Sequence, residues 1–127
     1  MTAASPIILV VEDEVLVQIL VMEVLQERGY DVRSADTAEE ALGLLKDHCR
    51  DVDVLLTDID LGSGANGLEL ARRARELCPG IRVIYVTGGP NREGQIERVP
   101  DSRLIPKPFQ LEQICNAVAL ELRPLRS

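Results

Sequence analysis

Aromatic and basic residues are both scarce in this chain of 127 residues. There is no tryptophan, and the two tyrosines and one phenylalanine make up 2% of the sequence. Proteins that bind single-stranded nucleic acids stack bases on aromatic side chains, so the material for such a platform is missing. Lysine and arginine number 14 against 21 aspartates and glutamates, which gives a net charge of −7. The sequence therefore predicts no nucleic-acid partner.

Long apolar runs and a leader-like start are missing as well. The longest apolar stretches, at 6–11 and 15–25, are short or interrupted by polar residues, so we expect no membrane insertion. The first residues, MTAASP, lack the basic segment leading into an apolar one that marks a secretory signal. These absences favour a cytoplasmic protein.

Cysteine and histidine, the residues of thiol and imidazole chemistry, are few in this chain. The three cysteines, Cys49, Cys78 and Cys115, are odd in number and share no metal-ligand spacing. Each falls at or near an apolar helical position, so we expect buried free thiols in a reducing compartment. With His48 as the one histidine, a Ser-His or Cys-His mechanism is disfavoured.

The residues that are present have the balance of one globular domain, with 46% apolar and 28% charged residues. Strand-like apolar runs alternate with helical periodicity along the whole chain. We expect strands over 7–11, 31–35, 52–57, 81–87 and 103–106. We expect helices over 14–28, 37–49, 66–77 and 111–122, with 90–103 the weakest helical segment.

Local signals support several of these boundaries. Gly29 is a natural C-cap, Thr37 with Glu40 forms a capping-box pattern, and Asn66 is a natural N-cap. Strand and helix thus alternate five times, which predicts a parallel sheet with helices on both faces.

In such folds the ligand crevice lies beyond the carboxyl ends of the strands. The polar residues at the predicted strand ends are Glu12, Asp13, Glu14, Asp58, Asp60, Thr87 and Lys107. Clustered carboxylates repel one another unless a cation lies among them, and oxygen ligands favour Mg²⁺. A carboxylate can also attack phosphorus and form an aspartyl phosphate. Phosphoryl transfer requires charge neutralisation, which a metal, a lysine and a hydroxyl group together supply.

The chain resembles the receiver domain of bacterial two-component response regulators along essentially its whole length. The matching segments, in order, are VVEDE, LLTDIDLGSGANG, VIYVTGG and IPKPF. The resemblance implies a three-layer, flavodoxin-like (CheY-like) α/β fold, a (βα)5 repeat whose five parallel strands lie in the order 2-1-3-4-5. It also implies that residues 1–127 are a single receiver domain with no effector domain in this chain.

Residue by residue, the resemblance makes Asp58 the phosphoryl acceptor. Asp13 and Asp58 would bind Mg²⁺ directly, with Glu12 acting through water and Asp60 through its backbone carbonyl. The charge of the Asp60 side chain is expected to alter the rate at which water removes the phosphoryl group. An Asp60→Asn variant tests this through the phosphoryl lifetime.

The remaining parts of the implied site are a hydroxyl group and an ammonium group. Thr87 would donate its hydroxyl to the phosphoryl group, and Lys107 would pair with it. The peptide bond between Lys107 and Pro108 is expected to be cis.

The resemblance also implies the partners. The phosphoryl group would come from a sensor histidine kinase or a histidine phosphotransfer protein, and the phosphorylated chain would bind an output partner protein. The chain would act as a monomer or a phosphorylation-linked dimer, and would catalyse only its own phosphorylation and dephosphorylation.

The chain departs from the family pattern in two places. Leu104 stands where an aromatic residue is usual, and Gly88 and Gly89 follow the threonine instead of alanine. We therefore hypothesise that switching orders residues 88–99, with two glycines making this loop mobile.

Two alternatives stay open at this point. One is an Mg²⁺-dependent phosphatase or Toprim-like phosphotransferase, since both use paired acids after strands. Against it, Gly62 replaces the usual Thr or Val of the phosphatases, and no substrate cap is evident. The other is a binding module that works without phosphorylation, which Leu104 favours and the complete set of site residues disfavours.

Overall fold

The computed structural model describes residues 5–61, 66–88 and 98–123, and within them strands alternate with helices except between the last two strands. The strands are β1 (Ile7–Val11), β2 (Asp31–Ala35), β3 (Val52–Asp58), β4 (Arg82–Thr87) and β5 (Ser102–Pro106). The helices are α1 (Val15–Glu27), α2 (Ala38–His48), α3 (Gly67–Leu77) and α4 (Leu111–Leu122). All strand pairings are parallel, and the sheet order β2-β1-β3-β4-β5 confirms the predicted fold.

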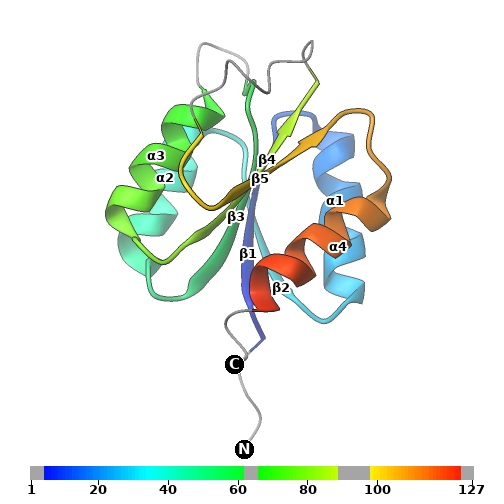
Figure 1. Ribbon diagram of the computed structural model, residues 1–127, viewed down its shortest axis with the longest axis horizontal. Helices are drawn as coiled ribbons and strands as arrows, with labels where there is room; N and C mark the ends of the chain where they lie inside the picture. The colour runs from blue at the N-terminus through cyan, green and yellow to red at the C-terminus, as the bar shows by residue number, and fades with distance from the viewer. Residues whose placement is uncertain (1–4, 62–65, 89–97, 124–127) are drawn as a thin grey trace, which may run out of the picture.

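The sheet lies between two helical layers. Figure 1 shows α2 and α3 together on one side of the sheet and α1 and α4 together on the other. Successive side chains of a strand point to opposite faces, so β1 contributes Leu9 and Val11 to one core and Ile8 and Val10 to the other. All four side chains are at most 2% exposed, which explains why β1 is a continuous apolar run.

The two predicted N-caps are confirmed. The Thr37 side chain accepts a hydrogen bond from the Glu40 backbone, and Asn66 accepts one from Leu68. The C-cap of α1 is Arg28 and not the predicted Gly29; Gly29 is the next residue and has a φ of +92°, a left-handed conformation that favours glycine.

The predicted helix within 90–103 falls largely outside the described residues, which omit 89–97. The described part before β5, residues 98–101, is not helical. None of the described helices is long and apolar enough to cross a membrane.

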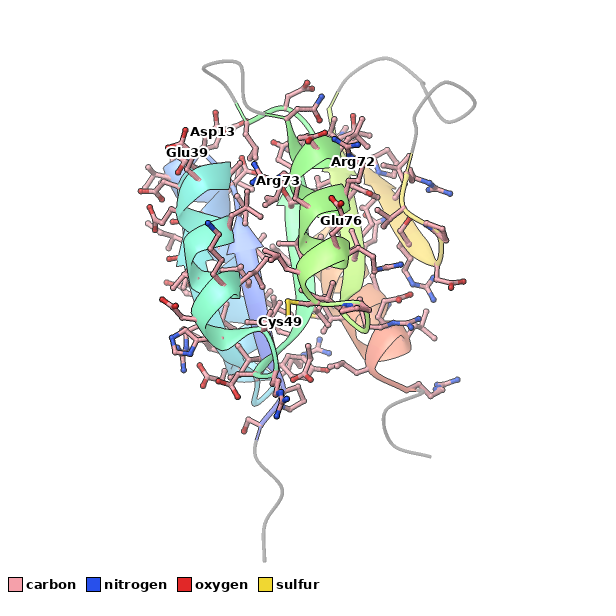
Figure 2. All side chains as sticks on the ribbon, turned by 90° about the vertical axis from the view of Figure 1, so that its left-hand side faces the viewer. Asp13, Glu39, Cys49, Arg72, Arg73 and Glu76 are labelled. Carbon is pink, nitrogen blue, oxygen red and sulfur yellow. A yellow bond between two sulfur atoms is a disulfide. The ribbon has the colours of Figure 1, made fainter. Side chains whose placement is uncertain are left out.

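The expectation of three free thiols was wrong for two of them. Cys49 and Cys78 form a disulfide across 29 residues of sequence, with their Cα atoms 5.5 Å apart. Cys49 follows α2 and Cys78 follows α3, and because these helices pack side by side, their last turns bring the two residues together. Cys115 is free and buried, as predicted. Figure 2 shows the disulfide well away from Asp13, which lies near the opposite end of the molecule.

Candidate functional site

The carboxyl ends of β1, β3 and β5 bring two acids and a lysine together. Asp58 is the last residue of β3, Glu12 follows β1 directly and Lys107 follows β5 directly. The Lys107 Nζ lies 2.8 Å from Asp58 Oδ2 and 3.6 Å from Glu12 Oε2. Both carboxylates are 5% exposed. The parallel topology thus gathers residues that are as many as 95 positions apart in the chain, as Glu12 and Lys107 are.

A third acid completes the cluster. Carboxylate oxygens of Glu12, Asp13 and Asp58 all lie within 4.8 Å of one another. Asp13 is exposed, whereas the other two are buried, so the cluster opens to solvent on the Asp13 side. Three oxygen ligands at this spacing have the chemistry of a site for a hard divalent cation.

The electrostatics of the cluster appear in Glu12. Burial, followed by the neighbouring negative charge of Asp58, raises the pKa of Glu12 to about 7. A backbone hydrogen bond from Glu14 and the charge of Lys107 act in the opposite direction without cancelling these effects. The Glu12 carboxyl group therefore changes protonation state near neutral pH.

Lys107 is held as a cation. Burial is the largest single influence and lowers the pKa of its ammonium group. The hydrogen bond and charge of Asp58, together with Glu12 and Glu14, outweigh burial and raise that pKa above its usual value. A fixed positive charge therefore faces the Asp58 carboxylate.

The backbone around Asp58 is tightly constrained. The Asp60 N–H donates to Asp58 Oδ1 at 3.1 Å, and the Gly67 N–H donates to the Ile59 carbonyl at 2.7 Å. A side chain at Gly67 would overlap the Asp58 carbonyl, so the start of α3 approaches the end of β3 as closely as only glycine permits. Asp60 itself is exposed and forms an isolated bridge with Asn66.

Thr87 and Lys107 come from adjacent strand ends. Thr87 is buried at the end of β4, and its neighbour Val86 is the register partner of Asp58. The Lys107 N–H donates to the Thr87 carbonyl at 2.7 Å. The bond between Lys107 and Pro108 is cis, as expected.

The contacts of two supporting residues were not predicted from the sequence. Glu14, one of the polar residues at the predicted strand ends, is the N-cap of α1, and its carboxylate lies 3.6 Å from Lys107 Nζ. Gln18 is buried on α1, and its amide donates to Glu12 O, Ala35 O and Asp36 Oδ1. The one available signal was a glutamine within an apolar helical stripe.

The two departures from the family pattern lie in different parts of the structure. Leu104 is half-buried on β5, pairs with Tyr85 in the β4–β5 register and packs against the core beneath α2 and α3. A Cβ built at Gly88 would lie 3.3 Å from the Lys107 side chain, whereas Gly89 and most of the 88–99 segment lie outside the described residues.

This fold and cluster of acids define a class of protein, and comparison with known families agrees. Residues 8–119 match the response regulator receiver domain. The chain belongs to this family, whose members are the phosphoacceptor modules of two-component signalling.

Among curated relatives, the chain is 31% identical over 118 residues to the sensor kinase CckA of Brucella abortus. That match covers 91% of this chain but 12% of CckA. The response regulator receiver protein CpdR of the same organism is 30% identical, with 87% of this chain and 92% of CpdR covered. The crystal structure of a response regulator receiver protein from Sinorhizobium medicae superposes with a TM-score of 0.87 at 29% identity, covering 96% of this chain and 98% of that one.

Proposed function

We propose that Asp58 accepts a phosphoryl group in an Mg²⁺-dependent reaction and that this modification switches a partner-binding surface. The observation that carries the proposal is the contact of 2.8 Å between Lys107 Nζ and the buried Asp58 carboxylate, inside a cluster of three acids. A carboxylate destined to become an acyl phosphate requires a fixed cation nearby, because the phosphoryl oxygens bring additional negative charge.

The donor set supports an Mg²⁺ ion. Asp13 and Asp58 would bind it directly, Glu12 through water and Asp60 through its backbone carbonyl. When bound, the ion neutralises charge on the phosphoryl oxygens. The raised pKa of Glu12 fits this assignment, since a cation would replace the proton that the crowded carboxylates otherwise retain.

In the proposed reaction an Asp58 oxygen attacks phosphorus, the new P–O bond forms and the bond from phosphorus to the donor's histidine nitrogen breaks. The Thr87 hydroxyl donates a hydrogen bond to one phosphoryl oxygen. Lys107 pairs with another, retaining its proton throughout because its pKa is raised. The chain thus catalyses its own phosphorylation, with the phosphohistidine protein as donor, and the subsequent hydrolysis, with water as the acceptor.

The surface beside the site suits a protein donor. Four apolar side chains of α1 are 43% to 76% exposed: Val15, Leu16, Ile19 and Leu20. Of these four, Leu20 also lines an open hollow of about 550 Å³, together with Lys107 and Phe109. An exposed apolar patch that extends to the hollow beside Lys107 supports docking of a histidine kinase or histidine phosphotransfer protein. We further propose that the chain acts as a single receiver domain in the cytoplasm, as a monomer or a phosphorylation-linked dimer.

A phosphorylation-independent binding module is the second candidate, favoured by Leu104 alone. Incubation with Mg²⁺ and acetyl phosphate, followed by intact-mass measurement, separates the two. We expect one phosphoryl group per chain in the parent protein and none in Asp58→Ala or without Mg²⁺. An unmodified parent protein would favour the binding module, and multiple turnover of a phosphate ester would favour a phosphatase.

A further inference from the structure

Tyr85 is a buried polar side chain that the proposed reaction does not use. It is fully buried on β4, and its hydroxyl accepts a hydrogen bond of 3.1 Å from the Val99 backbone N–H. Burial raises the pKa of the phenol, so it stays neutral. A buried tyrosine hydroxyl requires a polar partner, and here the partner belongs to the segment that leads into β5.

The position of Tyr85 relates it to the site. Tyr85 and Thr87 lie two residues apart on β4, so their side chains point to the same face of the sheet. Across the β4–β5 pairing Tyr85 lies beside Leu104, and both pack in the core beneath α2 and α3 with Val99. The aromatic ring that β5 lacks is therefore supplied by the adjacent strand.

Among the described residues, three hydrogen bonds hold residues 98–101, the segment around Val99. Besides the contact with Tyr85, the Ser102 hydroxyl donates to the Val99 carbonyl at 2.7 Å. Arg75 Nη1 on α3 donates to the Pro100 carbonyl at 2.8 Å. The Tyr85 bond is the one that joins this segment to the strand ending at Thr87.

We propose that Tyr85 is a positioning residue whose hydroxyl group couples the Val99 segment to the phosphoryl site. Position 104, where an aromatic residue is usual in the family, holds a leucine here, and Tyr85 on the adjacent strand takes the place of that ring. The inference rests on the proposed function. The bond is present in the unphosphorylated chain. The proposed reaction draws the Thr87 hydroxyl toward a phosphoryl oxygen, and an accompanying movement of β4 would strain the bond at Tyr85, two residues away. By linkage, removing the bond shifts the equilibrium toward the phosphorylated conformation and tightens binding of a phosphoryl mimic.

The test compares Tyr85→Phe with the parent protein. The substitution removes one hydroxyl and keeps the ring. We expect the affinity for beryllium trifluoride, measured by titration in the presence of Mg²⁺, to rise about two- to tenfold, the value of one hydrogen bond. A purely structural role would lower the melting temperature and leave this affinity unchanged. Tyr30→Phe is the matched control, because Tyr30 is half-buried against the opposite core, and its affinity should equal that of the parent.

Ser102→Ala is a second variant. It removes the hydrogen bond to the Val99 carbonyl and should also raise the affinity for the phosphoryl mimic. If the parent protein binds the mimic and Tyr85→Phe binds it equally or more weakly, the inference is wrong and the proposed function stands. If the parent protein binds no mimic, both are wrong. Should Tyr85→Phe fail to fold, an unchanged affinity in Ser102→Ala overturns the inference.

Discussion

At the scale of single residues, Glu12 connects the acid cluster to pH. Its carboxyl group is buried beside Asp58, and its pKa rises from 4.5 to about 7 on folding. A carboxyl group whose pKa is raised in the folded state contributes stability that is fully present below pH 4.5 and is lost as the pH rises through about 7. A bound cation would neutralise the Glu12 carboxylate after it loses its proton.

We therefore expect the free energy of unfolding, without Mg²⁺, to fall as the pH increases from 4.5 to about 7, by up to about 1.4 kcal/mol per pH unit, and to level off at higher pH. Added Mg²⁺ should restore stability on the alkaline side. Denaturation at several pH values, with and without Mg²⁺, measures both effects. Glu12→Gln serves as the control, since it removes the titrating group and should flatten the pH profile. A parent profile as flat as that of the variant contradicts this prediction.

At the scale of elements, the turn from β3 into α3 depends on one glycine. A Cβ at Gly67 would overlap the Asp58 carbonyl, and moving α3 away breaks the hydrogen bond from Gly67 to Ile59. We expect Gly67→Ala to destabilise the fold by about 1–3 kcal/mol and to slow phosphorylation. Chemical denaturation and phosphorylation rates measure the two effects.

Gly43 on α2 is the matched control, because nothing lies within 4 Å of a Cβ built there. Gly43→Ala should stabilise the protein by about 0.5–1 kcal/mol, through helix propensity alone. Equal behaviour of the two variants would show that the close approach at Gly67 has no energetic consequence.

The ends of α2 and α3 are joined by the Cys49–Cys78 disulfide, which closes a loop across 29 residues. Loop-closure entropy for this length predicts that reduction lowers the free energy of unfolding by about 3–4 kcal/mol. Denaturation with and without a dithiol reductant measures the loss. A double variant, Cys49→Ser with Cys78→Ala, should not respond to the reductant, whereas Cys115→Ala should respond like the parent protein. A parent protein indifferent to reduction rules out the bond in solution.

At the scale of the whole molecule, the exposed side of α1 is the surface that we propose for docking of the phosphoryl donor. Leu16 is 76% exposed on α1, whereas Leu77 is 42% exposed on α3, across the sheet. We expect Leu16→Lys to slow phosphoryl transfer from a phosphohistidine protein about tenfold, the cost of losing a buried apolar contact. Its reaction with acetyl phosphate should be unchanged, because no docking surface is required. Leu77→Lys should match the parent protein with both donors. If Leu16→Lys also slows the reaction with acetyl phosphate, the assignment of α1 as the docking surface is contradicted.

Much of this architecture follows from the order of residues. The apolar run of β1 and the cap at Thr37 are local signals, and parallel topology then brings Asp58 and Lys107 to one edge of the sheet. The disulfide and the exposure of Leu20 were not predictable, because they depend on how neighbouring helices are aligned. The roles of Gln18 and Glu14 were missed for a similar reason: both depend on contacts with distant backbone and side-chain atoms.

The most direct test of the central claim locates the modified atom. After reaction with acetyl phosphate and Mg²⁺, borohydride reduces an acyl phosphate to the alcohol, and peptide mass spectrometry then identifies the residue. We predict the reduced side chain at position 58 alone, and only when Mg²⁺ was present. Reduction at Asp13 or Asp60 in place of Asp58, or an unmodified chain under these conditions, would contradict the account.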